Sequence, residues 1–238
     1  MRVSDKAIVL QATRHGDKKY ILKLYTSRHG LLTAIAHVGK SPSSKVRAAT
    51  ILPLSIADVE IINKQNREIQ QLTEATSCFV TEHLHENIAR LSIAQFMNEV
   101  MLKSLKEQQH NEGLFEFIET CVRYLDHSDE FMNLHLYFML GLARYMGFEP
   151  QNNYGPDAPY FDCREGRFSV VPLAFPLGLS QEDSRFFSSV LASNLLQAKL
   201  SNASRQLLLE ILTSYFRLHL PGFNELKSVE VLKEVLSG

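Results

Sequence analysis

Apolar and polar residues alternate in short runs through the first third of the chain, as they do in half-buried β-strands. Residues 7–13 and 20–26 form two such runs, rich in β-branched and aromatic side chains, and each ends at a glycine-containing turn. A third run over residues 31–38 leads into a Gly/Ser/Pro-rich stretch over 39–44. The pattern predicts three consecutive strands with a loop after the third.

Two more strands are predicted before the pattern changes. Residues 51–62 favour a longer strand, in which Pro53 belongs at an edge or a bend. The last strand is expected over residues 68–76, with Ile69 and Leu72 on its apolar side.

Five strands with short connections predict a small antiparallel barrel over residues 1–78. A hairpin turn is expected at 63–66, and no connection is long enough for a crossover helix. Among five-stranded barrels, the OB-fold is the one that binds oligonucleotides and oligosaccharides.

From residue 79 to residue 238 the apolar spacing becomes helical. Residues 84–105 are apolar around most of a helix's girth, which indicates a central, buried helix. The predicted fold class is therefore α+β, a barrel followed by an all-α domain with an irregular segment over about 148–179. Further helices are predicted over residues 114–125, 131–146 and 207–220, from Ser180 and after 228, with Ser180 and either Ser201 or Asn202 as caps.

The composition narrows the class of protein only a little. Of the 238 residues, 45% are hydrophobic and 21% are charged, an ordinary globular balance. No apolar run approaches the ~18 residues of a membrane span, and the N-terminal apolar run is too short for a signal peptide. The cysteines, Cys78, Cys121 and Cys163, have no paired spacing, which argues against disulfides and a cysteine zinc knuckle. We expect a cytoplasmic protein.

Charge distinguishes the two halves of the chain. Residues 1–80 hold 12 Lys/Arg and 6 Asp/Glu, whereas residues 81–238 hold 13 and 20. The opposite net charges suggest different partners, and the basic N-terminal half suggests an anionic one.

The basic residues combine with aromatic residues in a way that suits a nucleic-acid strand. Cationic side chains contact phosphates, and aromatic rings stack on bases without sequence preference. Tyr20 fits the barrel core equally well, and the basic cluster as a whole has an alternative interpretation as a solvated surface. The DNA-binding candidates are Arg14, Lys18, Lys19, Lys23, Arg28, Lys40, Lys45 and Arg47, and the stacking candidates are Tyr20, Tyr25 and His29.

The sequence shows little sign of a catalytic or metal site. His83 and His85 are two residues apart, so on a helix their imidazoles would point about 200° apart and could not share an ion. Glu82, His83 and Glu86 leave a metal-dependent hydrolase as a weaker alternative. The chain has no phosphate-binding glycine loop and no nucleophile elbow.

Several short motifs occur in a fixed order along the chain. The N-terminal ones are KAIVL at residues 6–10, YILKLYT at 20–26 followed by GLL at 30–32, and GK-x-P-x-S at 39–44. Near the other end lie YF-x-LHL at residues 215–220 and LKS at 226–228. In this order the motifs resemble those of the RecO family of bacterial recombination mediators, and the last two resemble its closing helices.

The resemblance implies an N-terminal OB-fold, a helical C-terminal domain and a non-enzymatic role in DNA repair and recombination. It implies binding of single- and double-stranded DNA, annealing of complementary strands, and partnership with RecR and the tail of single-strand binding protein to load RecA. It also implies cytoplasmic localisation, on the nucleoid during repair. The alternative within the same class is an OB-fold RNA-binding accessory protein.

Two expectations concern the helical domain. Many relatives carry four cysteines in the irregular segment, but this chain has only Cys163 there, so we expect a degenerate zinc-finger region without zinc and no cofactor. An acidic tail peptide that ends in an apolar residue would need a cation beside an apolar groove. Arg123 and Arg144 are the candidates for it, with ordinary surface arginines as the alternative interpretation.

Overall fold

A computed structural model describes residues 2–41, 43–63, 67–79, 81–84, 86–106 and 110–237. The chain divides into two compact units. The first comprises Met1–Asn87 and Asn98–His127, and the second comprises Ile88–Met97 and Ser128–Gly238. Each unit is described by itself below.

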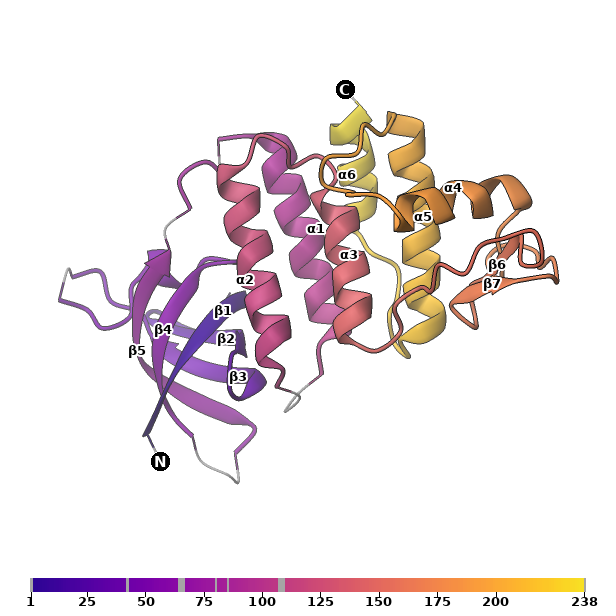
Figure 1. Ribbon diagram of the computed structural model, residues 1–238. Helices are drawn as coiled ribbons and strands as arrows, with labels where there is room; N and C mark the ends of the chain where they lie inside the picture. Colours follow the sequence, from indigo (N-terminus) through magenta and orange to yellow (C-terminus); the bar gives the residue numbers. More distant parts are fainter. Residues whose placement is uncertain are drawn as a thin grey trace. The chain divides into compact units, whose positions relative to one another are not determined.

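The first unit is built around a closed five-stranded barrel with the strand order β1-β2-β3-β5-β4 (Figure 1). Its last helix, α2, lies beside the barrel. A short 3₁₀ turn over Ala48–Ile51 follows β3. The bounds are β1 Arg2–Arg14, β2 Lys19–Thr26, β3 Gly30–His37, β4 Ile56–Ile62, β5 Ile69–Phe79 and α2 Glu112–His127.

One pairing in the barrel is parallel, so the prediction of a wholly antiparallel barrel is wrong. β3 and β5 pair in parallel from Thr33 opposite Ile69 to Ala36 opposite Leu72. The other four pairings are antiparallel. An odd number of strands cannot alternate direction around a closed ring, so at least one neighbouring pair must run the same way.

Alternation along the strands separates the barrel interior from its outer face. Leu22, Leu24, Ala34 and Ala36 lie in the core, and Tyr20 packs against it from a half-buried position. Tyr25 has the opposite parity and is nevertheless fully buried. It lies under α2, where its ring stacks on another aromatic ring at 6.1 Å between centroids.

A β-bulge in β1 allows this strand to form a hydrogen bond with helix α1, Ile88–Ser104. The register of β1 against β2 shifts between Val9 and Gln11, so Leu10 is the extra residue. The Leu10 carbonyl, displaced from the ladder, accepts a hydrogen bond from Asn98 Nδ2 at 2.8 Å.

Two details of the predicted strands are wrong. Ile51 ends the 3₁₀ turn, residues 52–55 form a further turn, and β4 begins only at Ile56, because Leu54 adopts a positive φ of 64°. On β5, Leu72 is buried but Ile69 is 45% exposed, since residues three apart on a strand face opposite sides. The predicted turn at 63–66 lies outside the described residues, apart from Asn63.

The segment after the barrel is held by one buried carboxylate. Asp126 on α2 accepts backbone hydrogen bonds from Glu82, His83 and Leu84 at 2.8–3.0 Å. Leu84 is therefore fixed ahead of the helix that was predicted to contain it. Helix α1 starts at Ile88, whose side chain is 65% exposed.

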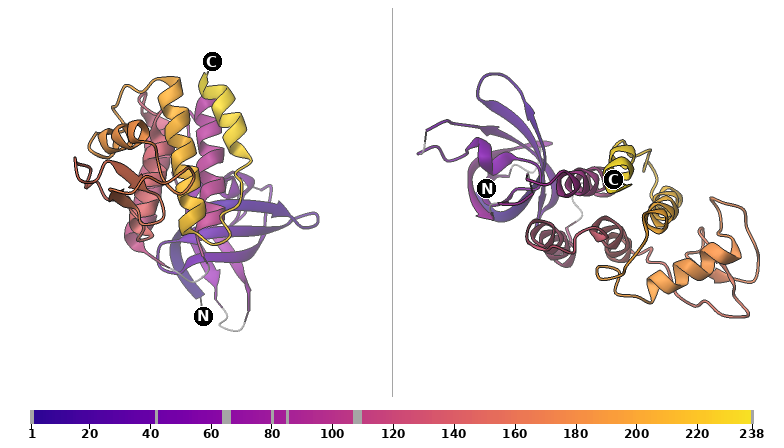
Figure 2. Two further views of the ribbon diagram at one scale, coloured as in Figure 1. Left: turned by 90° about the vertical axis from the view of Figure 1, so that its right-hand side faces the viewer. Right: turned by 90° about the horizontal axis from the view of Figure 1, so that it is seen from above.

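The second unit is mainly helical, with one small hairpin in the segment that was predicted to be irregular. Helices α5 and α6 run beside each other in Figure 2. As predicted, two serines cap helices. Ser180 caps α4 by accepting a hydrogen bond from Asp183 N, and Ser201 caps α5 by accepting one from Ser204 N. The bounds are α3 Leu134–Tyr145, β6 Tyr160–Asp162, β7 Arg167–Ser169, α4 Gln181–Leu191, α5 Asn202–His219 and α6 Ser228–Ser237.

Within the described residues, every helix is too short or too polar to cross a bilayer.

Candidate nucleic-acid interface

The ladder between β2 and its neighbours decides which lysines face solvent. Leu22 and Leu24 point into the barrel, so Lys19 and Lys23 point out, and both are exposed. Lys23 lies opposite Gln11 of β1 and Thr33 of β3. The two predicted lysines therefore share one outer face with uncharged neighbours.

The basic loop after β3 lies next to the turn between β1 and β2. The backbone N–H of Val38 donates to the carbonyl of Lys18 at 2.8 Å, and Gly39 N donates to Val46 O at 3.0 Å. These bonds place the exposed Lys40, Lys45 and Arg47 at the same end of the barrel as Lys18. Residues that are far apart in the sequence thus form one basic edge.

Internal contacts occupy some of the predicted cations. Lys45 Nζ lies 3.2 Å from Glu74 Oε2. The guanidinium of Arg14 donates to the carbonyls of Gly16 and Asp17, which ties the β1–β2 turn together. Besides Arg14, whose partners are carbonyls, five of the predicted cations form no ion pair with any residue that the structure describes: Lys18, Lys19, Lys23, Lys40 and Arg47.

Arg28 and His29 lie at the opposite end of β2, about 25 Å away at ~3.3 Å per residue. The buried carboxylate of Asp5 accepts from the Arg28 backbone N–H at 3.2 Å, and its Oδ2 lies 2.7 Å from His29 Nδ1. The grouping of these two residues with the basic loop is therefore wrong. They organise the β2–β3 turn.

The prediction that Tyr25 stacks on bases is also wrong, because Phe115 of α2 covers its ring. Tyr20 turns toward the barrel core, which matches the alternative interpretation of this residue. The sequence analysis did not identify the uncharged residues that lie beside the lysines on the outer face of the barrel. Strict alternation along residues 19–26 was the signal that could have found them.

Comparison with known proteins places the chain in a family. Residues 1–79 match the family described as Recombination protein O N terminal, and residues 85–230 match Recombination protein O C terminal. The chain belongs to the RecO family. The DNA repair protein RecO of Flavobacterium johnsoniae is 31% identical over 245 residues, and that of Flavobacterium psychrophilum is 31% identical over 241; both alignments cover 100% of each chain. That of Phocaeicola vulgatus is 32% identical over 237 residues and covers 97% of each chain.

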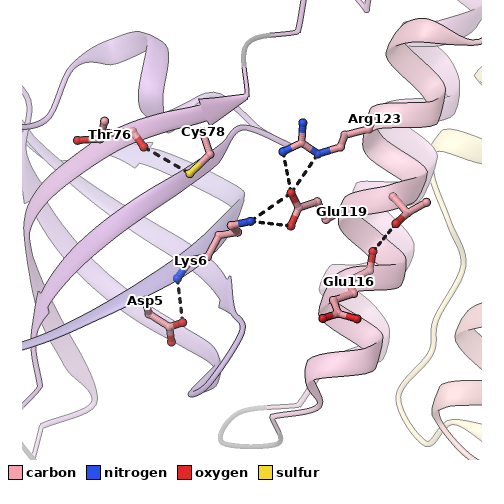
Figure 3. Close-up of polar contacts among 8 residues, drawn as sticks. Asp5, Lys6, Thr76, Cys78, Glu116, Glu119 and Arg123 are labelled. Carbon is pink, nitrogen blue, oxygen red and sulfur yellow. Dashed lines mark hydrogen bonds and ion pairs between the residues drawn. The ribbon is translucent and has the colours of Figure 1, made fainter.

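In this RecO-family chain, Arg123 lies beside an open groove of about 670 Å³ in the first unit. Arg123 Nη2 lies 2.7 Å from Glu119 Oε1, and Lys6 Nζ lies 3.3 Å from Glu119 Oε2. Figure 3 shows both side chains pointing toward this carboxylate. The guanidinium also lies 4.5 Å from the ring centre of Phe79, a cation–π contact. Tyr124 and His127 add further rings to the groove.

Arg144 has a different setting from Arg123. It is exposed on α3 in the second unit, where its Nε lies 3.2 Å from Glu149. Arg144 does not line the groove beside Arg123. Of the two arginine candidates, Arg123 is the one for which the structure describes an adjoining groove.

The groups considered for metal binding do not gather into a site. His83 Nδ1 lies 3.2 Å from Glu86 Oε2, and His85 lies outside the described residues. Among the described residues, no three His, Cys, Asp or Glu side chains are grouped as metal ligands would be. Burial raises the pKa of Cys163 to about 12, and the charge of Asp162 adds to the effect, so this thiol stays protonated at neutral pH.

Proposed function

We propose that this chain acts in DNA repair and recombination as a non-enzymatic protein that binds single- and double-stranded DNA through its barrel. The observation that carries the proposal is the group of five unpaired, exposed cations on β2 and the adjoining edge. Such a group suits a polyanion, because each phosphate contact releases a condensed counterion. The relatives' name, DNA repair protein RecO, supports the same role.

The proposal includes an OB-fold for the barrel. A closed five-stranded barrel with the order β1-β2-β3-β5-β4 suits it. In OB-folds, nucleic acid binds across the second and third strands and the loops after the first and fourth strands. In this chain that region carries Lys18, Lys19 and Lys23, and the loop with Lys40 and Arg47 lies next to it.

The finer steps of the proposed role follow from the family resemblance. A surface that neutralises phosphates lowers the repulsion between two strands, which favours annealing. RecR and the tail of single-strand binding protein are the proposed partners, with RecA loading as the outcome. We place the acidic tail peptide in the groove beside Arg123, where its carboxylates would compete with Glu119. Titration of a labelled tail peptide against wild type and Arg123→Ala tests this placement.

We also propose that the segment around Cys163 needs no zinc and that the chain has no cofactor. The proposed location is the cytoplasm, on the nucleoid during repair.

The main experiment is the salt dependence of single-strand binding. If Lys18, Lys19, Lys23, Lys40 and Arg47 each contact a phosphate, log affinity should fall against log salt with a slope of about −3.5, at about −0.7 per contact. The double variant Lys40→Ala/Arg47→Ala should make the slope shallower by about 1.4 and weaken all sequences alike, because phosphate contacts carry no base information.

The matched control is Arg144→Ala, which removes an exposed arginine from the acidic half of the chain. It should leave the slope unchanged. A slope that is unaltered in the loop double variant would mean that these cations are only a solvated surface. Stronger competition by RNA than by DNA of the same sequence would favour the RNA-binding alternative.

A further inference from the structure

The outer face of β2, β3 and β5 carries an apolar strip between the proposed phosphate contacts. Ile21 of β2 lies directly opposite Ile35 of β3. On β2, Lys19 and Lys23 lie two residues to either side of Ile21, on the same face. Both isoleucines are half-buried, so part of each side chain remains in contact with water.

A third isoleucine extends the strip onto β5. Ile69 pairs with Thr33, two residues from Ile35, and is therefore a diagonal neighbour of Ile35 on the same face. It is 45% exposed, one of the few large apolar side chains of the first unit that are open to water.

No acidic side chain faces outward beside this strip in the described part of these ladders. The register gives the outward neighbours as Gln11 and Thr13 of β1, Thr33 and His37 of β3, and Gln71 of β5. The face is thus apolar along its middle, cationic at two points and uncharged elsewhere. This pattern complements a strand with anionic phosphates on one side and uncharged bases on the other.

The strip contains no aromatic ring on which a base could stack, because Tyr20 packs toward the core and Tyr25 lies under α2. Branched aliphatic side chains offer apolar contact area without a preferred partner. Only unpaired bases can reach them, because in a duplex the bases are stacked and paired inside the helix.

We propose that Ile21, Ile35 and Ile69 form an aliphatic platform for the unpaired bases of single-stranded DNA, and that this platform makes the barrel bind single strands more tightly than duplex. The inference rests on the proposed function, since it assumes that the lysines beside the strip hold phosphates. In this proposal the lysines contact phosphates of both single-stranded and duplex DNA, whereas the isoleucines contact only single-stranded DNA.

The test compares the full-length wild-type chain with Ile21→Thr/Ile35→Thr, which keeps β-branched side chains and hence strand propensity. The variant should bind an oligothymidine about tenfold more weakly at every salt concentration, with an unchanged salt slope, because apolar contacts release no counterions. Its affinity for a duplex of equal length should not change. Wild type should bind an abasic strand of the same length about as weakly as the variant binds oligothymidine.

Two matched variants separate the possible outcomes. Lys19→Ala/Lys23→Ala should weaken binding to both forms and make the single-strand slope shallower by about 1.4. Ile69→Thr alters a side chain that lies outside the barrel core and is 45% exposed, so the fold should be retained, and it should weaken single-strand binding several-fold. Equal loss on single strand and duplex, or no loss in either isoleucine variant, would overturn the platform while the lysine result keeps the proposed function. A wild-type chain that binds no DNA would overturn both.

Discussion

A side chain on a strand can contact a ligand only if no neighbouring element covers it. Tyr25 is an example of a side chain that a helix shields from solvent. Its ring lies on the outer side of the barrel but stacks under Phe115. Burial raises the pKa of its hydroxyl to about 12, and that hydroxyl has no hydrogen-bond partner among the described residues. An unsatisfied buried hydroxyl costs free energy.

Replacing Tyr25 with Phe therefore tests the burial of this residue. The variant removes the unsatisfied hydroxyl and keeps the ring, so the free energy of unfolding should stay the same or rise by up to ~1 kcal/mol. Its affinity for single-stranded DNA should equal that of wild type. Urea denaturation and a binding titration measure the two quantities, and a several-fold loss of affinity with intact stability would restore Tyr25 as a stacking residue.

Other residue placements show which information a sequence carries. A period of two along residues 19–26 is enough to place Lys19 and Lys23 on one face. By contrast, the positions of Arg28 and His29 depend on hydrogen bonds to Asp5. This residue lies more than twenty positions earlier in the sequence, and only the closed barrel brings it close. A long-range partner of this kind leaves no local signal.

Among the elements, the β6–β7 hairpin is fixed by aromatic packing. The ring of Phe161 lies 4.9 Å from that of Phe168, 4.8 Å from that of Phe187 on α4 and 6.0 Å from that of Tyr215 on α5. His219 Nε2 lies 2.8 Å from the carbonyl oxygen of Cys163. These contacts supply the tertiary support that a two-stranded hairpin lacks alone.

Chelation and mutation together test this account of the hairpin. EDTA should leave the melting temperature unchanged, because the proposed support is packing rather than metal. Phe161→Ala should lower the free energy of unfolding by about 3–5 kcal/mol, the usual cost of a large cavity. Val170→Ala removes a side chain that is 68% exposed and should change stability by less than about 0.5 kcal/mol. A fall in melting temperature with EDTA would contradict the metal-free proposal.

Local chemistry predicted the elements better than their pairing. The serines at 180 and 201 identify two helix starts, since a hydroxyl can accept from the exposed N–H groups of a first turn. The parallel β3–β5 pair has no such signal, because ring closure and not local sequence requires it. The start of α1 was also missed, because Asp126 fixes the preceding residues from a distant helix.

At the scale of the whole molecule, pH should act through the second unit. His135 is 1% exposed and its ring packs edge-on against Phe96 at 6.0 Å between centroids. Burial lowers the pKa of His135 to about 3, and the charge of Arg205 acts in the same direction. The folded chain thus keeps this imidazole neutral where an unfolded chain would protonate it.

The sign of the effect follows from proton binding. Between pH 6.5 and about 3 the unfolded state binds the extra proton, so the free energy of unfolding should fall as pH falls, by about 1.4 kcal/mol per unit. Circular dichroism during urea denaturation at pH 7, 6, 5 and 4.5 measures this slope. His135→Leu should flatten it, whereas His15→Leu, at an exposed histidine, should not. An equal slope in wild type and His135→Leu would assign the acid sensitivity to other groups.

The cover that α2 places over the barrel has a consequence for synthesis of the chain. Ile8 and Tyr25 face each other across the β1–β2 ladder, and both are fully buried. The last strand of the barrel leaves the ribosome well before α2, whose residues end at His127. At about 5–20 residues per second, a nascent barrel would expose this apolar surface to water for several seconds. During that interval the new chain is open to chaperones and to aggregation, and a fragment ending at residue 79 would never leave that state.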